Sequence, residues 1–164
     1  MIVDLGCGTA KRAEVGVDLV ALPGVDYVCN LGFEPLPFEN ESVDKFIAWD
    51  LLEHIPMSIW IQQNTKMVRL TPIIYLFKEI HRCLIGGGIF ESLTPHYPAQ
   101  EVWQDPTHVS VWTPNTWLYF TASAEGINEG TLLHSYGIDF RFETVDSQTP
   151  NDSHMLKILR KPYR

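Results

Sequence analysis

The stretch that decides the fold is Asp4-Leu5-Gly6-Cys7-Gly8-Thr9, near the start of the chain. It follows the apolar run Met1-Ile2-Val3, so we expect residues 1–5 to form a buried strand that ends in a turn. Gly6 and Gly8 have no Cβ, which permits unusual backbone angles and lets a ligand approach the main chain. Because a G-x-G pair also occurs in purely structural turns, its meaning depends on the rest of the sequence.

Polar residues stand at the ends of four short apolar runs in the first third of the chain. After residues 1–5, further strands are expected at 15–19, 25–31 and 43–49. In an open α/β sheet, the carboxyl ends of parallel strands meet at one edge, where ligands bind. Turn propensity explains a single such residue, but four in register indicate a binding edge. The four residues are Asp4, Asp18, Asn30 and Asp50.

The remaining elements complete an α/β pattern. A helix is expected over residues 71–84, with Thr71 as N-cap, Pro72 in the first turn, and an apolar stripe at i, i+4, i+7 and i+11. A strand follows at 89–94, a short helix begins near residue 113, and strands at 138–145 and 155–159 form a hairpin. The order predicts a doubly wound, mostly parallel sheet with a C-terminal antiparallel hairpin, in one domain over residues 1–164.

The spacing between the glycine loop and Asp18 distinguishes two kinds of cofactor. An acidic residue at the end of the second strand suits the two hydroxyls of a ribose. Asp18 follows Gly6 by only twelve residues, against about 20 in dinucleotide-binding folds. The first helix must therefore be shortened to about one turn or be absent, and Lys11 stands where the third glycine of G-x-G-x-x-G belongs. Both observations disfavour a dinucleotide-binding oxidoreductase.

Charge and composition restrict the partners. The chain has 12 Lys and Arg against 20 Asp and Glu, a net charge of −8, which repels phosphate backbones, so no nucleic acid is expected. No apolar run is long enough to span a bilayer, and no signal-peptide pattern is present, so no membrane partner is expected. The three cysteines form no close pair, which favours a cytoplasmic location.

Five segments in order resemble the class I (Rossmann-like) S-adenosylmethionine-dependent methyltransferases, over the chain up to about Pro95. They are D-L-G-C-G-T (4–9), G-V-D-L (16–19), C-N-L-G-F-E-P-L-P-F-E-N-E-S-V-D (29–44), L-L-E-H-I-P (51–56) and F-K-E-I-H-R-C-L-I-G-G-G (77–88). The resemblance implies that the loop holds the methionine part of S-adenosyl-L-methionine, Asp18 the ribose and Asn30-Leu31 the adenine edge, with Trp49 near the sulfonium. The implied cofactor residues are Asp4, Gly6, Cys7, Gly8, Asp18, Leu19, Asn30, Leu31 and Trp49. Two positions depart from the family pattern: Ala10 replaces a loop glycine, and Asn30 replaces the usual Asp.

Asp50, Glu53 and His54 are expected on one helical face, at i, i+3 and i+4. Similar segments in enzymes resembling the ubiquinone-pathway and small-RNA 2′-O methyltransferases bind a divalent metal together with a later histidine. His108 stands in a comparable place, so Asp50, Glu53, His54 and His108 are candidate metal ligands. The alternative is that Glu53 and His54 only cap and pack the helix. Without a metal, His54 or His108 is the candidate general base, since an imidazole titrates near neutral pH.

The expected activity is methylation of a small-molecule or sugar-like acceptor at oxygen. The alternative is a non-catalytic S-adenosylmethionine-binding accessory protein, because the cofactor would be less covered than is usual in the family. The missing cover implies a lid from residues 57–70, a partner subunit or weak cofactor binding, and a homo-oligomer is one expected form of the protein. Tyr97 and Trp103 follow the strand at 89–94 and are candidates for lining the acceptor pocket.

Overall fold

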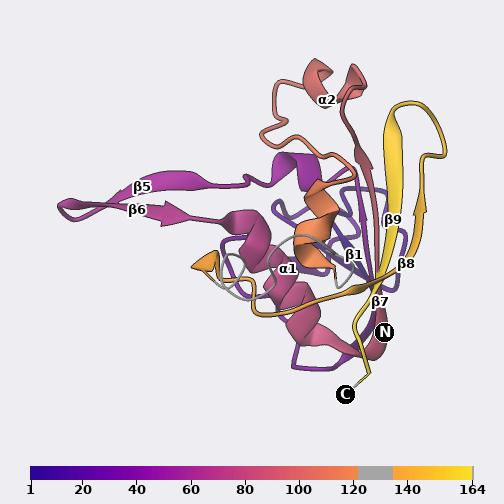
Figure 1. Ribbon diagram of the computed structural model, residues 1–164. Coiled ribbons are helices and arrows are strands. Elements are labelled where there is room, and N and C mark those ends of the chain that lie inside the picture. Colours follow the sequence, from indigo (N-terminus) through magenta and orange to yellow (C-terminus); the bar gives the residue numbers. More distant parts are fainter. Residues whose placement is uncertain (122–134, 164) are drawn as a thin grey trace.

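A seven-stranded sheet forms the centre of the computed structural model, which describes residues 1–121 and 135–163 (Figure 1). Its strand order is β3-β2-β1-β4-β7-β9-β8, with β9 antiparallel to both of its neighbours and the first five strands parallel. The predicted mostly parallel α/β sheet with a C-terminal antiparallel hairpin is confirmed. The strands are β1 (Ile2–Leu5), β2 (Val15–Asp18), β3 (Tyr27–Val28), β4 (Val43–Trp49), β7 (Leu84–Pro95), β8 (Glu143–Gln148) and β9 (His154–Arg160).

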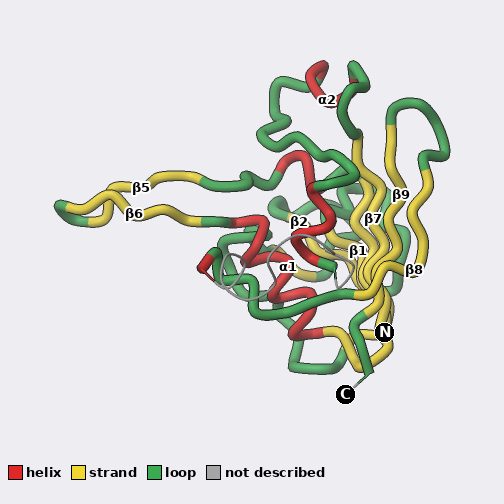
Figure 2. The backbone as a smooth tube through the Cα atoms, in the orientation of Figure 1, coloured by secondary structure: helices red, strands yellow, loops and turns green. Residues whose placement is uncertain are grey.

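The helix α1 (Pro72–Cys83) packs against one face of this sheet, as its apolar stripe predicts. Phe77 is fully buried; its ring stacks on Phe120 at 4.1 Å between centroids and meets the edge of Phe90 at 5.4 Å. Phe120 belongs to the short helix η2 (Thr116–Phe120), which lies near α1, and η1 (Leu52–His54) adds Leu52 to the same core (Figure 2). The fourth described helix, α2 (Glu101–Gln104), follows the end of β7.

The core therefore lies on one side of the sheet. Successive strand residues point to opposite faces, and the strand residues of the core cluster share the face that α1 covers. They include Val3, Leu5, Phe46, Ala48, Phe90, Met155 and Leu159. The burial patterns of β7 and β9 alternate accordingly, with fully buried residues followed by half-buried ones.

The helix between β1 and β2, which was expected to be shortened to about one turn or absent, is absent. Residues 6–14 connect β1 to β2 without a helix, and residues 19–26 connect β2 to β3 in the same way. Hydrogen bonds to strand atoms hold the first loop instead. The N–H groups of Gly6 and Cys7 donate to the carbonyl of Val17, and the N–H of Arg12 donates to the carboxylate of Asp4 at 2.7 Å.

Three segments differ from the sequence-based expectation. The strand expected at 25–31 is only the two residues of β3, because the chain turns at Asn30, whose carbonyl accepts from Phe33 and Glu34. The strand expected at 138–145 begins at Glu143, because Ile138 and Phe140 enter the core instead. The hairpin β5 (Ile59–Gln63) and β6 (Lys66–Leu70) was not expected, and it projects away from the domain (Figure 1). In the described residues, no helix has the length and apolarity to cross a membrane.

Candidate functional site

The first hollow lies at the carboxyl ends of β1 and β2 and encloses about 170 Å³. It brings together five of the nine residues expected to bind a cofactor, namely Gly6, Asp18, Leu19, Asn30 and Leu31. The remaining lining residues are Phe33, Leu51, His54 and Ile55. A polar rim with apolar walls suits a ligand that has a flat ring system and a ribose.

Gly6 and Asp18 give the rim of this hollow its shape. Gly6 has φ +68°, and a Cβ there would lie 2.9 Å from Cδ1 of Leu51, so glycine is required for both its backbone angle and the close approach. Asp18 accepts hydrogen bonds from the N–H of Gly8 at 2.9 Å and from the N–H of Val20 at 3.1 Å. Each carboxylate oxygen has a further lone pair, which leaves Asp18 able to accept from ribose hydroxyls.

Asn30 and its apolar neighbours form the opposite wall. The backbone of Asn30 is committed, since its N–H donates to Glu34 at 2.8 Å and its carbonyl accepts from Phe33 at 2.9 Å. Within the described part of the chain, its side-chain amide makes no hydrogen bond and is available to a ligand. Leu19 is 60% exposed and Phe33 41% exposed, so both offer apolar surface to a ring.

The other four expected cofactor residues, Asp4, Cys7, Gly8 and Trp49, do not line the hollow. Asp4 is fully buried: burial raises its pKa, and its Oδ1 has no hydrogen-bond partner among the described residues. Cys7 is buried against Gly16, where an added Cβ would lie 2.6 Å from its Sγ. Gly8 donates to Asp18, as described above. The side chain of Trp49 turns to the sheet face, where Nε1 donates to Glu91 at 3.0 Å and the Arg12 guanidinium lies 5.0 Å from the ring centre.

A second hollow of about 280 Å³ adjoins the first and shares His54 with it. Glu53, His54 and His108 meet there, with one potential ligand atom of each within 4.8 Å of the others. Two imidazoles and a carboxylate are a donor set that suits Zn²⁺ and similar divalent ions. The other lining residues are Asp50, Pro95, Glu101, Gln104, Asp105 and His154.

Neighbouring groups hold the Nδ1 atoms of both imidazoles. The Nδ1 of His108 lies 3.1 Å from the carbonyl of Val102, which only accepts, so the proton of His108 is on Nδ1. The hydroxyl of Thr107 donates to Asp105 at 2.6 Å and therefore accepts from Nδ1 of His54 at 3.1 Å. In the neutral imidazoles these contacts leave a lone pair on each Nε2, which is the arrangement that outer hydrogen bonds give to metal-binding histidines.

Glu53 is the buried carboxyl group of the cluster. It is 2% exposed, its Oε2 accepts from the hydroxyl of Thr94 at 2.8 Å, and its Oε1 lies 4.0 Å from Nε2 of His108. Burial raises the pKa of Glu53 above its ordinary value of 4.5. A carboxylate removed from water in this way is stabilised by a cation or by a proton.

Asp50 does not belong to this cluster, and the expected helical face is wrong. The helix η1 starts only at Leu52 and is a single turn. Asp50 precedes it with φ +50°, and the N–H of Asp50 donates to the carbonyl of Leu93. Its carboxylate lies 3.2 Å from Nε2 of His154 instead. No motif around His154 in the sequence indicates this position. His154 reaches the carboxyl-end edge of the sheet only through its pairing with Pro95 in the antiparallel strands β7 and β9.

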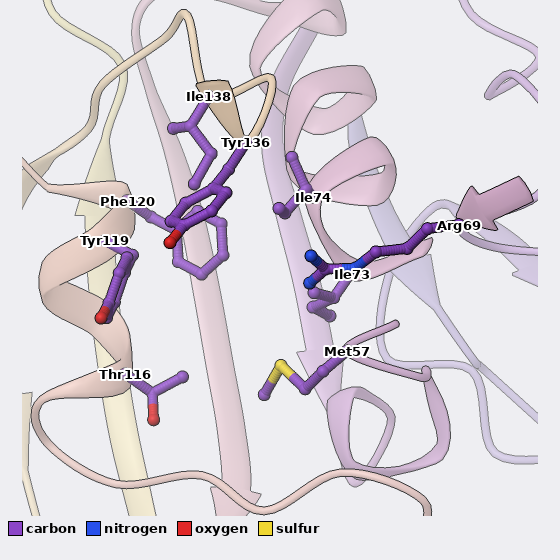
Figure 3. Close-up of a pocket in the computed structure, with 9 residues that line it drawn as sticks. All are labelled: Met57, Arg69, Ile73, Ile74, Thr116, Tyr119, Phe120, Tyr136 and Ile138. Carbon is purple, nitrogen blue, oxygen red and sulfur yellow. The ribbon is translucent and has the colours of Figure 1, made fainter. Parts of the chain in front are cut away.

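A third hollow, of about 270 Å³, lies between α1 and η2 (Figure 3). Among the described residues its walls are mostly apolar, with Arg69 as the one charged lining residue, and Tyr119 and Phe120 border it. Tyr97 and Trp103, the aromatic residues expected in an acceptor pocket, are 56% and 65% exposed and line none of these three hollows.

Comparisons with known proteins bear on the fold. Neither the family models nor the curated proteins give a match to this sequence. Among solved structures, a SAM-dependent methyltransferase from Methanosarcina mazei aligns with 99% of this chain and 92% of its own, at 14% identity and a TM-score of 0.62. An S-adenosylmethionine-dependent methyltransferase from Mesorhizobium loti aligns with 98% of this chain and 90% of its own, at 18% identity and a TM-score of 0.57.

The cyclase SpnF has the same fold: it aligns with 99% of this chain and 74% of its own, at 14% identity and a TM-score of 0.62. The chain thus has the fold of the class I S-adenosylmethionine-dependent methyltransferases. Because a cyclase shares it, the reaction has to be argued from the site.

Proposed function

We propose that this chain is an S-adenosylmethionine-dependent methyltransferase that methylates an oxygen atom of a small, sugar-like or otherwise hydroxylated acceptor. The observation that carries the proposal is the position of His54, which lines both the first and the second hollow. A donor in the first hollow and an acceptor in the second would therefore meet at one imidazole.

The residues of the first hollow fit the cofactor. Asp18 offers carboxylate lone pairs to the ribose hydroxyls, the free amide of Asn30 suits the adenine edge, and Leu19 and Phe33 offer apolar contact to the ring. The orphaned Oδ1 of Asp4 adds an unused acceptor beneath the loop. When bound, S-adenosylmethionine supplies a methyl group activated by its sulfonium, so the protein has to provide alignment and exclusion of water.

The second hollow fits an acceptor that has to lose a proton. Apart from Pro95, its lining is carboxylates, imidazoles and an amide, which suits hydroxyl groups better than an apolar molecule. The free Nε2 lone pairs of His54 and His108 are positioned to take the hydroxyl proton as methyl transfer proceeds. The net charge of −8 favours a small molecule over a nucleic acid.

Glu53, His54 and His108 also fit a divalent metal, whereas Asp50 lies outside the set. Such an ion would lower the pKa of an acceptor hydroxyl and orient it. The buried carboxylate of Glu53 would then be neutralised by the ion and not by a proton.

Binding calorimetry with S-adenosylhomocysteine and NAD in parallel tests the cofactor. We expect binding of S-adenosylhomocysteine only; binding of NAD only would refute the proposal. A methyl-transfer assay over a panel of sugars, phenols and other hydroxylated molecules then tests the reaction. Binding of S-adenosylmethionine without transfer to any member would favour a non-catalytic, cofactor-binding accessory protein.

A further inference from the structure

The sheet has a second face on which no helix of the described residues packs. The residues that alternate with the core residues of β4, β7 and β9 point to this face. We call their apolar members the open face: Ile47, Trp49, Ile89, Leu93, Leu156 and Ile158. None of the six belongs to the core cluster, and all except Ile47 are partly exposed to solvent.

The composition of the open face is unusual for a surface that meets water. Parallel sheets are normally covered on both faces, and antiparallel strands with one solvated face carry polar residues there. Here the outward positions of β7 and β9 are largely apolar, as Leu93 paired with Leu156 and Ile158 paired with Glu91 show. A contiguous apolar surface of this kind marks a contact with another molecule. The connections at residues 6–14 and 19–26, where helices would cover it, are loops.

The charges on this side of the sheet indicate the kind of partner. Lys45 pairs with Glu91 at 2.7 Å, and Arg160 pairs with Glu143 at 2.7 Å. The Arg12 guanidinium, which lies over Trp49, has the carboxylate of Asp4 at 4.0 Å. The charges around the open face are therefore balanced, while the chain as a whole carries −8. Two copies of the chain repel each other over most of their surfaces, but they meet without net repulsion here.

Among the described residues this surface has no excess of positive charge, so it does not attract a phosphate backbone or an anionic membrane. By contrast, a two-fold contact requires a patch that is complementary to itself, with apolar area and both signs of charge. The open face has both: Leu93 lies between Trp49 and Leu156, and Glu91, which is paired with Lys45, lies between Ile47 and Ile158. We propose that it is the contact surface between two copies of this chain, related by a two-fold axis.

Light scattering coupled to size-exclusion chromatography, together with sedimentation velocity, tests the oligomeric state. We expect the wild-type protein to have twice the 18.7 kDa mass of the chain at micromolar concentration. Ile158→Glu and Leu93→Glu each bury a charge at the contact, and we expect the dimer dissociation constant to rise by at least about 100-fold. A wild-type protein that remains monomeric at about 100 μM, a concentration typical of weak complexes, would overturn the proposal.

Ile61→Glu is the matched control, because Ile61 is an exposed apolar residue on the projecting hairpin. We expect Ile61→Glu to remain dimeric; monomers in this variant alone would overturn the proposal in favour of contact through the hairpin. Circular dichroism melting identifies any variant that fails to fold.

A single-cysteine test does not depend on destabilising the contact. The three native cysteines are buried, so Ile158→Cys provides one accessible thiol. We expect a bifunctional thiol reagent to link two Ile158→Cys chains and not two Ile61→Cys chains, and the reverse result would refute the proposal.

Discussion

The N–H of Gly8 donates a 2.9 Å hydrogen bond to Oδ2 of Asp18, so the carboxylate that faces the first hollow also holds the glycine loop. The loop has no helix behind it to fix its conformation. Asp18 therefore connects the shape of the loop with the proposed binding of a ribose, so a change at Asp18 is expected to alter both.

Replacing Asp18 with Asn tests this connection. Asparagine offers one acceptor oxygen without charge, so it cannot hold both Gly8 and Val20 and also accept from a ribose. We expect the dissociation constant of S-adenosylhomocysteine, measured by calorimetry, to rise about 10- to 100-fold. Asp26→Asn is the matched control, because Asp26 also accepts from a backbone N–H, that of Gly16 in β2, but does not line the hollow. Equal losses of affinity in the two variants would contradict the assignment.

The two loop glycines should differ in their tolerance of alanine. Both have positive φ, which costs about 1 kcal/mol for a residue with a Cβ. At Gly6 the added Cβ also meets Leu51 at 2.9 Å, whereas at Gly8 it meets no atom within 4 Å. We expect Gly6→Ala to lower the free energy of unfolding by roughly 1–3 kcal/mol more than Gly8→Ala does. Urea denaturation measures the difference, and equal values would argue against the close approach.

Removal of His108 should abolish metal binding at the cluster. Loss of an outer hydrogen-bonding partner already lowers the affinity of a site for its metal by about 10- to 100-fold. Loss of a ligand in His108→Ala should lower the metal affinity by at least this factor. Calorimetric titration with Zn²⁺ or Co²⁺ measures the affinity, and the methyl-transfer assay with and without EDTA measures its use. His96→Ala is the control, since His96 bonds to Ser153 and lies outside the cluster. Activity that is insensitive to both EDTA and His108→Ala would exclude a catalytic metal.

Glu53→Gln should stabilise the metal-free protein while removing its function. Burial raises the pKa of Glu53, so the folded state retains the proton to higher pH than the unfolded chain. The stability of the wild type therefore decreases as pH rises from the ordinary value of 4.5 through the raised pKa in the fold, and the glutamine variant lacks this loss. We expect the variant to melt higher at pH 7, by about 2–4 °C for each kcal/mol recovered. A difference in melting temperature that shrinks as pH rises would contradict the assigned direction.

The reactivity of the three buried thiols measures whether the native structure exposes them to solvent. Burial raises the pKa of Cys83 to about 11 and also raises the pKa values of Cys7 and Cys29. The thiolate is the reactive form, so we expect no rapid reaction of the native protein with Ellman's reagent at pH 8. Three thiols should react after denaturation. A thiol that reacts rapidly in the native protein would show that one of these sites is open.

Local patterns in the sequence predicted much of the sheet and the first hollow. β4 has the predicted bounds, α1 differs from its prediction by one residue at each end, and Gly6, Asp18 and Asn30 meet at one edge because parallel strands end together. Features that depend on pairing over long distances were not predicted. Asp50 was placed on a helix that starts later, and His154 reaches it through the register of β9 on β7.

The short elements around the first hollow connect ligand binding with the lifetime of the protein. β3 has only two residues, both exposed, and the loops beside it contain no helix, so few hydrogen bonds of regular structure hold this corner, although Cys29 and Leu31 reach the core. Regions of this kind open first, ahead of global unfolding. A ligand that binds only the closed corner adds to its stability in proportion to the logarithm of its concentration. We therefore expect amide hydrogen exchange near Asn30 to slow as the cofactor level rises, and a cell depleted of cofactor to lose this protein faster to its proteases.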